Sequence, residues 1–328
     1  MNPEDRFVDK LRSLLPRSDA ILGPGDDAAL VQRDAGLLAA TTDLLVEGVD
    51  FLPGEDPERL GRRAATVNLS DLAAMGAAPE FFLLSIGFAP EKGEDYPLAI
   101  ARGAIARAGE FGAHLVGGDL SAAPQTVISV ALWGKPAGPP LTRAGASPGE
   151  LLYVSGHPGE AAAGLRLARE GPSVAGLPPD TERQLLDAFH DPLPRIALGL
   201  GLSRQGLATS AIDVSDGLGV DAARLARASG VRLVLDRSLL PVSEALRCFA
   251  SRTGIEPVEL LLAGGDDYEL LFTVPEAQEG RLAKLAADSG VPVTRIGRVE
   301  AGAGAMLSDG GALRDIGSLG HDHLMATR

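Results

Sequence analysis

The chain has 328 residues, of which 45% are hydrophobic and 23% are charged, the composition of a globular protein large enough for two domains. Its formal net charge of −14 opposes binding to nucleic acid or to an anionic membrane, so we expect neither partner. One cysteine, Cys248, excludes a disulfide within the chain, and the absence of a signal-peptide pattern or a long apolar run predicts a cytoplasmic protein.

Apolar periodicity predicts alternating helices and strands in the first half of the chain. A proline at the start and a glycine at the end indicate one long helix, Pro57–Met75, ended by Gly76. The other expected elements are a helix at Pro3–Leu15, a strand at Leu37–Thr42, a strand at Glu80–Phe88, a helix at about Asp95–Gly109 and a strand at Thr126–Trp133. The proline- and glycine-rich run Gly134–Pro140 cannot hold a helix or a central strand, so we divide the chain into domains 1–135 and 136–328.

The second half also mixes strands and helices in irregular order. Strands are predicted at Leu151–Ser155, Ala208–Asp213, Val231–Leu235, Leu270–Val274 and Val293–Val299. Helices are predicted near Glu160–Arg169, Asp180–Phe189, Pro194–Gln205, Gly217–Ser229 and Glu276–Ser289, and Cys248 is placed on a further helix. This order predicts a mixed α/β and α+β fold in both halves.

Six short aspartate-bearing segments recur along the chain, and we interpret them as turns. They are Gly25-Asp26-Asp27, Thr41-Thr42-Asp43, Asn68-Leu69-Ser70-Asp71, Gly117-Gly118-Asp119, Asp213-Val214-Ser215-Asp216-Gly217 and Gly264-Gly265-Asp266-Asp267. Any one of them alone is an ordinary turn, since glycine and aspartate are common turn residues. Three follow strand-like apolar runs, at Leu38–Ala40, His114–Val116 and Ala211-Ile212, and strand ends are where α/β proteins bind ligands.

Convergence of these segments would require a compensating cation. Two carboxylates ~4 Å apart repel by roughly 4 kcal/mol at an effective dielectric constant near 20. Carboxylate oxygens suit Mg2+, which usually completes its coordination with water and substrate phosphates. The set therefore predicts a metal-dependent phosphoryl-transfer site. Asn68 and Asp71 share a helix face with Ala64 and Met75, as either a hydrogen-bonded pair or a ligand pair.

Common nucleotide and nucleophile motifs do not explain the chain. Gly23–Ala28 fits the dinucleotide pattern G-x-G-x-x-G/A, but two aspartates would then face the pyrophosphate. A P-loop and a G-x-S-x-G elbow are absent. The run His321-Asp322-His323 could bind a transition metal, although such a terminal segment is more often a solvated tail.

Longer motifs identify a family resemblance. They are GPGDDAAL (Gly23–Leu30), TTDLLVEGVDF (Thr41–Phe51), AATVNLSDLAAMGAAP (Ala64–Pro79), LVGGD (Leu115–Asp119), LTRAGASPGE (Leu141–Glu150), SAIDVSDGL (Ser210–Leu218) and AGGDDYELLFTV (Ala263–Val274). In these segments the chain resembles the thiamine-monophosphate kinases, of the superfamily that includes aminoimidazole ribonucleotide synthetase. The resemblance implies ATP-dependent, Mg2+-assisted in-line phosphorylation of thiamine monophosphate to thiamine diphosphate. It also implies a homodimer that pairs its N-terminal sheets, with the C-terminal domain covering the site.

The resemblance also implies roles for individual residues. Several Mg2+ ions would be held by Asp27, Thr41, Thr42, Asp43, Asp71, Asp119, Asp213 and Asp216. ATP would meet Gly118, Asp119, Arg143 and Ser215. Asp50 and Asp266 match positions that contact the thiamine phosphate, and His321 lies where an aromatic residue packs on it. These three positions depart from residues seen in relatives, which carry His, Glu, and Tyr or Trp there.

Other members of the superfamily and another class of protein remain alternatives. Selenophosphate synthetases carry a cysteine or selenocysteine in their N-terminal glycine-rich segment, and hydrogenase-maturation relatives end in a cysteine-bearing tail; this chain has neither feature. An aminoimidazole ribonucleotide synthetase matches less well. A non-catalytic nucleotide or metal sensor on the same scaffold would share the motifs without the turnover. An ionised acceptor phosphate needs no strong general base, so we assign none.

Overall fold

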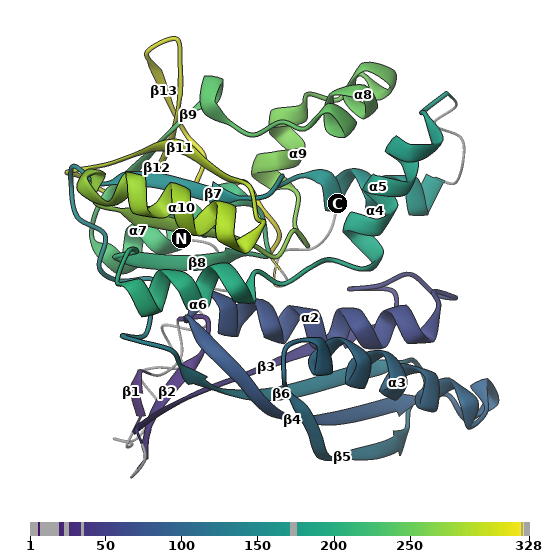
Figure 1. Ribbon diagram of the computed structural model, residues 1–328. Helices are drawn as coiled ribbons and strands as arrows, with labels where there is room; N and C mark the ends of the chain where they lie inside the picture. The colour runs from purple at the N-terminus through teal and green to yellow at the C-terminus, as the bar shows by residue number, and fades with distance from the viewer. Residues whose placement is uncertain are drawn as a thin grey trace.

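The computed structural model describes Arg6, residues 20–22, 26–33, 36–170 and 176–322, and Leu324. The helix predicted at Pro3–Leu15 lies, apart from Arg6, outside these residues. Two sheets form the framework, one from each half of the chain (Figure 1). Within the described residues, no helix combines the length and apolar character needed to cross a membrane.

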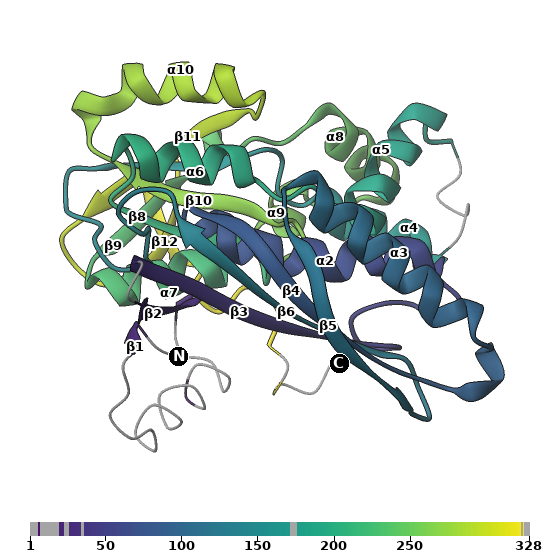
Figure 2. The same cartoon turned by 60° about the horizontal axis from the view of Figure 1, so that its bottom comes forward.

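The first sheet has six strands in the order β1-β2-β3-β6-β4-β5. In chain order they are β1 (Ala20–Leu22), β2 (Ala29–Arg33), β3 (Gly36–Val46), β4 (Ala77–Phe88), β5 (His114–Ala122) and β6 (Val127–Pro136). Helices α2 (Pro57–Ala74) and α3 (Asp95–Glu110) cover one face, and the 3-10 turn η1 (Pro90–Lys92) precedes α3. Among the residues that the structure describes, Figures 1 and 2 show no helix on the opposite face. Two large apolar side chains on that face, Leu44 and Leu83, are exposed.

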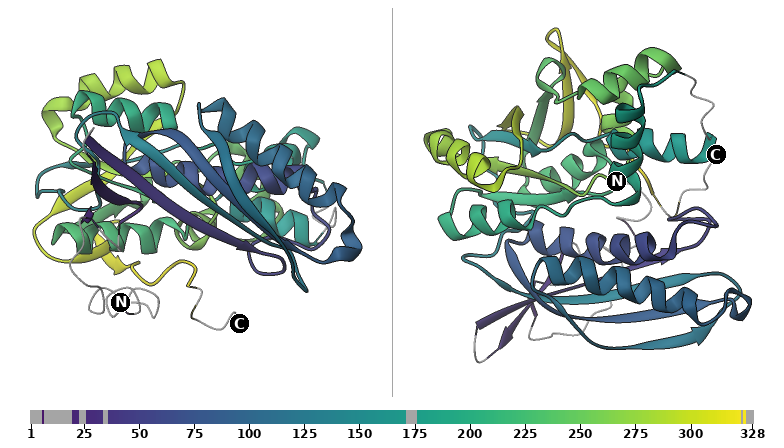
Figure 3. Two further views of the ribbon diagram at one scale, coloured as in Figure 1. Left: turned by 90° about the horizontal axis from the view of Figure 1, so that it is seen from below. Right: turned by 45° about the vertical axis from the view of Figure 1, so that its right-hand side comes forward.

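The sequence of α2 explains where it begins and how closely it packs. The Asp56 carboxylate accepts a hydrogen bond from the Arg59 N–H at 2.9 Å, and Pro57 occupies the first helical turn. Gly61 allows α3 to approach, because a Cβ there would lie 1.9 Å from the carbonyl oxygen of Ile100. Most of α2 is buried, because the helix lies between the first sheet and the second half of the chain (Figure 3).

The second sheet has seven strands in the order β13-β12-β9-β11-β7-β10-β8. Their bounds are β7 (Leu151–Ser155), β8 (Ser210–Val214), β9 (Arg232–Asp236), β10 (Glu269–Val274), β11 (Val293–Glu300), β12 (Gly304–Asp309) and β13 (Ala312–Asp315). The helices are α4 (Glu160–Glu170), α5 (Pro179–His190), α6 (Ile196–Gln205), α7 (Leu218–Ser229), α8 (Glu244–Thr253), α9 (Pro257–Ala263) and α10 (Glu279–Ser289), with 3-10 turns η3 (Arg237–Leu239) and η4 (Glu276–Gln278). The mixed fold class is therefore confirmed.

Four predictions about local structure were wrong. Gly134–Pro136 continue β6 instead of leaving the sheet; Pro136 can do so because it is the last residue of the strand. Thr41–Asp43 and Gly117–Asp119 lie inside β3 and β5 and are not turns, because pairing with β6 and β4 keeps both segments extended. The Asn68–Asp71 segment is not a turn either and lies within α2, as the predicted helix Pro57–Met75 requires. Strands β1, β2, β12 and β13 and helix α9 were not predicted. The first sheet ends at Pro136 and β7 begins at Leu151, and the division at residue 135 stays a prediction.

Candidate functional site

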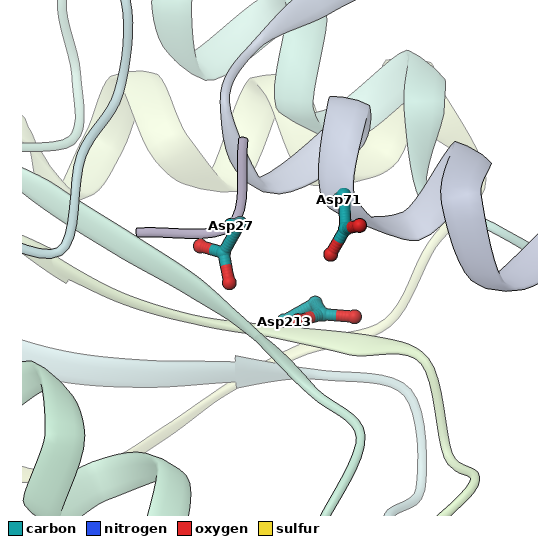
Figure 4. Close-up of side chains that lie close together, drawn as sticks. All are labelled: Asp27, Asp71 and Asp213. Carbon is teal, nitrogen blue, oxygen red and sulfur yellow. The ribbon is translucent and has the colours of Figure 1, made fainter. Parts of the chain in front are cut away.

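Three carboxylates from distant parts of the sequence meet between the two halves of the chain. Asp27 precedes β2, Asp71 lies in the last turns of α2, and Asp213 lies near the end of β8. One oxygen from each lies within 4.8 Å of the other two (Figure 4). The convergence expected from the aspartate segments thus occurs for these three residues, which we call the acidic cluster.

A neighbouring donor orients each carboxylate of the acidic cluster. The Thr41 hydroxyl donates to Asp71 at 2.5 Å, and the Ser70 hydroxyl donates to Asp213 at 2.7 Å. The Arg143 guanidinium donates to Oδ1 of Asp27 at 2.6 Å, while the other oxygen of Asp27 is buried and has no hydrogen-bond partner in the described part of the chain. A buried carboxylate oxygen without a donor is costly unless it binds a cation.

The electrostatics of the acidic cluster also indicate a cation site. Burial, reinforced by the nearby charges of Asp43 and Asp213, raises the pKa of Asp71 well above its usual value. Burial and the charge of Asp27 do the same to the pKa of Asp213. Burial is also the main cause that raises the pKa of Asp43 to about 6. Several buried carboxylates that disfavour their own ionisation form a site suited to a divalent cation with oxygen ligands, such as Mg2+.

The first sheet sorts the predicted residues of β3 by face. Thr41 and Asp43 lie on the face toward α2, where the Thr41 hydroxyl contacts Asp71 and the charge of Asp43 helps to raise the pKa of Asp71. Thr42 lies on the opposite face, since strand side chains alternate, and its hydroxyl donates to the carbonyl oxygen of Val130 at 3.0 Å. The Asn68 amide nitrogen donates to the Ala64 carbonyl oxygen one helical turn earlier, while its amide oxygen is buried and has no hydrogen-bond partner in the described part of the chain.

Gly118 and Asp119 are not brought to the acidic cluster within one chain. They lie on the edge strand β5, three strands from β3 and therefore ~14 Å away at the usual strand spacing. Asp119 lies in register with Ser85 of β4, Ser129 of β6 and Leu44 of β3. Its side chain therefore projects from the face opposite α2 and α3, which we call the bare face of the sheet. Gly118 has a packing requirement of its own, because a Cβ there would lie 1.8 Å from the carbonyl oxygen of Leu84.

The other residues predicted to meet metal or ATP surround the cluster and already have protein partners. Arg143 pairs with Asp27, and its backbone N–H donates to Asp26 at 3.0 Å. Asp216 forms an ion pair with Arg224 and is not a member of the acidic cluster. The backbone N–H groups of Ser215 and Asp216 both donate to Asp221 at 3.1 Å, which fixes the loop after β8.

The residues predicted to contact the acceptor lie in two places. Asp50 and Asp266 line one small cavity of about 30 Å³, between residues 48–52, α4 and the end of α5. The Asp50 carboxylate accepts the Val46 N–H at 2.8 Å, and Asp266 forms an ion pair with Arg63 at 2.9 Å. The backbone N–H of His321 donates to the Asp216 carbonyl oxygen at 2.8 Å, so this segment lies on the loop after β8.

Sequence reasoning missed four polar residues of the site: Asp26, Arg63, Ser70 and Asp221. Asp26 and Ser70 stood inside motifs that had been recognised but were given no role. Arg63 carried a usable signal, because it shares a helical face with Val67 and Ser70, and a charge among buried positions needs a partner. Asp221 gave none, since an acidic residue in the first turn of a helix is ordinary.

Comparison with known proteins identifies the family. The AIR synthase related protein N-terminal domain matches residues 25–135, and the corresponding C-terminal domain matches residues 147–309. A thiamine-monophosphate kinase of Escherichia coli is 40% identical over 300 residues, covering 90% of this chain and 89% of the relative. The crystal structure of thiamine-monophosphate kinase from Stenotrophomonas maltophilia has 38% identity and a TM-score of 0.78, covering 93% of this chain and 96% of its own. The structure of AaThiL complexed with AMPPCP and TMP has 31% identity and a TM-score of 0.83, covering 97% of this chain and 95% of its own. The chain therefore belongs to the AIR synthase related proteins and, among them, to the thiamine-monophosphate kinase family.

Proposed function

We propose that this chain transfers the terminal phosphoryl group of ATP directly to thiamine monophosphate, forming thiamine diphosphate and ADP. The observation that carries the proposal is the convergence of Asp27, Asp71 and Asp213, whose buried oxygens lie within 4.8 Å of one another. AaThiL, a structural relative, is complexed with AMPPCP and TMP. Phosphoryl transfer depends on positioning and charge neutralisation more than on covalent catalysis, and a carboxylate cluster that holds a cation can supply both.

Mg2+ is the cation we propose for the acidic cluster. The fit rests on the oxygen-only donor set, on the unpartnered Oδ2 of Asp27 and on the raised pKa values of Asp71 and Asp213. When bound, Mg2+ neutralises charge on phosphate oxygens. Asp27, Asp71 and Asp213 would hold it, with Asp43 adjoining Asp71. We keep the backbone of Thr42 and the carboxylate of Asp216 as candidate ligands of further ions.

The chain's own residues then orient the two substrates. Arg143 can offer a bidentate contact to a nucleotide phosphate if it exchanges its pairing with Asp27. The loop with Ser215 is held by Asp221, so its position is set before ATP binds. Asp50 and Asp266 line a cavity at the other end of the site, which we assign to the acceptor. An acceptor phosphate oxygen is already ionised at neutral pH, so the reaction needs no strong general base.

We also propose that the protein acts as a homodimer that pairs the bare faces of the first sheets. The exposed Leu44 and Leu83 on this face support the pairing, because exposed apolar surface often marks an interface. Asp119 lies on the same face and cannot reach the acidic cluster of its own chain. A second copy placed against this face would let Asp119 serve the site of its partner.

Release of ADP from ATP, measured with and without thiamine monophosphate, tests the function. We expect Mg2+-dependent ADP release that requires the acceptor, and a product that contains two phosphates. The same assay across a small panel of acceptor phosphates separates this kinase from other ATP-dependent members of the superfamily. Binding of Mg-ATP without ADP release for any acceptor would instead identify a nucleotide sensor.

A further inference from the structure

Arg63 is a fully buried cation outside the acidic cluster. It lies in the middle of α2, and its side chain is 1% exposed. Two side chains from the second half of the chain surround its guanidinium. The Nη2 atom lies 2.9 Å from a carboxylate oxygen of Asp266, and the guanidinium carbon lies 4.5 Å from the centre of the Phe189 ring. A buried charge of this kind is costly to retain, so its position needs an explanation.

Both partners of Arg63 line the small cavity assigned to the acceptor. Asp266 and Phe189 form part of its wall, together with Asp50 and Leu165, whereas Arg63 does not reach the cavity. Arg63 therefore lies behind two wall residues and contacts both. Because it belongs to the first half and they belong to the second, it also sets how the two halves meet at this cavity.

The Asp266 carboxylate is held in one direction by protein contacts on both of its oxygens. Tyr268 donates its hydroxyl to Oδ1 at 2.8 Å, and Arg63 pairs with Oδ2. The backbone of Asp266 is also constrained, with φ of 65° in the left-handed region, and its N–H donates to the Ser215 carbonyl oxygen at 2.7 Å. A non-glycine residue in this conformation is unusual and persists only when its surroundings enforce it.

We propose that Arg63 is a positioning residue for the acceptor: through Asp266 and Phe189 it fixes one wall of the small cavity, and this wall is a surface that thiamine monophosphate contacts. It acts behind the wall, since its guanidinium has almost no exposed surface. It also balances the charge of Asp266, so that this carboxylate serves the acceptor as an oriented hydrogen-bond acceptor more than as a source of net negative charge. The inference rests on the proposed kinase function and assigns part of its selectivity to a residue that does not contact substrate.

The test compares Arg63→Met with Arg62→Met as a matched control. Arg62 is the adjacent residue on α2 and also binds an acidic residue of the second half, Asp191, at 3.0 Å, but its acidic partners do not line the cavity. We expect Arg63→Met to raise KM for thiamine monophosphate by about tenfold or more, while KM for ATP changes by less than about twofold. Arg62→Met should leave both KM values near those of the wild type.

A double-variant comparison separates positioning from general stabilisation. If Arg63 acts through Asp266, then Arg63→Met/Asp266→Asn should raise the acceptor KM no more than Asp266→Asn alone. This double variant carries no unpaired buried charge, so it and Arg63→Lys decide the question if Arg63→Met does not fold. Arg63→Lys keeps the charge but loses the planar contact with Phe189, and should show an intermediate rise in acceptor KM.

Three results would overturn the inference. The first is an equal rise in KM for thiamine monophosphate and for ATP in Arg63→Met or Arg63→Lys. The second is a rise in acceptor KM in the double variant that equals the sum of the two single effects. The third is a rise in acceptor KM in Arg62→Met as large as that in Arg63→Met. Each would make Arg63 a structural link between the halves only. Failure of the wild-type protein to release ADP with thiamine monophosphate would instead reject the proposed function, so the two failures are distinguishable.

Discussion

The hydroxyl of Ser70 donates a 2.7 Å hydrogen bond to the carboxylate of Asp213, at the point where the two halves of the chain meet. Ser70 belongs to α2 and Asp213 to β8, so the contact joins the helix that carries Asp71 to the strand that carries a second cluster carboxylate. The site therefore depends on the relative position of the halves as much as on the residues themselves.

Mg2+ together with ATP should stabilise the protein. A bound cation would relieve the repulsion among the carboxylates of Asp27, Asp71 and Asp213, which lie within 4.8 Å of one another. A ligand at a hundredfold excess over its Kd adds about 2.7 kcal/mol to the free energy of unfolding. A thermal melt with Mg-ATP should show a raised Tm that ATP with EDTA does not reproduce. An unchanged Tm would count against a cation in the cluster.

Asp71→Asn should nearly abolish turnover while the fold survives. Asp71 is a cluster carboxylate, and loss of an anionic ligand weakens a metal that stabilises charge in the transition state by several kcal/mol. Turnover at saturating Mg2+ and the circular dichroism spectrum should be measured together. Glu58→Gln is the matched control, because Glu58 is an exposed carboxylate in the first turn of the same helix. Near-normal rates in Asp71→Asn would make Asp71 a buried structural carboxylate only.

Stabilisation by Mg2+ should grow as the pH rises through about 6. Burial raises the pKa of Asp43 to about 6 in the metal-free protein, above its ordinary value of 3.8. A raised folded-state pKa stabilises the metal-free fold at low pH, and this contribution is lost between pH 3.8 and about 6. Mg2+ must displace the same protons, so it competes poorly at low pH. The rise in Tm caused by Mg2+ should be larger at about pH 7.5 than at about pH 5.5. A pH-independent rise would place the cation elsewhere.

Asp266→Asn should weaken acceptor binding more than ATP binding. Removal of a charge-assisted contact costs roughly 1.5–3 kcal/mol, which raises KM for thiamine monophosphate roughly tenfold to a hundredfold. The melting temperature should fall as well, because the buried Arg63 loses its carboxylate partner. His321→Tyr, on the segment beside the loop after β8, should hold or improve acceptor binding, since Tyr is a residue that relatives carry there. Equal losses for ATP and acceptor in Asp266→Asn would contradict a site with two separate ends.

Mixed dimers should reveal whether Asp119 serves the partner's site. Asp71→Asn and Asp119→Asn should each be nearly inactive alone. Because Asp119 lies on the bare face of the sheet, a mixed dimer of the two variants would contain one site with both native residues. Activity should return to roughly a quarter of the wild-type level in a random equal mixture, since half the dimers are mixed and each has one intact site. No recovery after subunit exchange would show that both residues act within one chain.

The sequence by itself determined the secondary structure wherever apolar periodicity and end signals agreed. Pro57 and Gly76 bounded α2 almost to the residue, and the continuous apolar run of β7 was identified with its observed bounds. Motif spacing was enough to indicate the family and to select Asp27, Asp71 and Asp213 as candidate metal ligands. These features depend on contacts between residues near each other in sequence, or on residue types that the chemistry requires.

Only the tertiary structure decided which candidates meet and which already have partners. Strand pairing kept Thr41–Asp43 and Gly117–Asp119 extended, and it placed Asp119 on the face away from the cluster. Packing of α2 against the second half buried Arg63 and supplied Asp266 and Phe189 as its partners. A local pattern cannot reveal such pairings, because the burial and charge of each side chain depend on segments far away in the sequence.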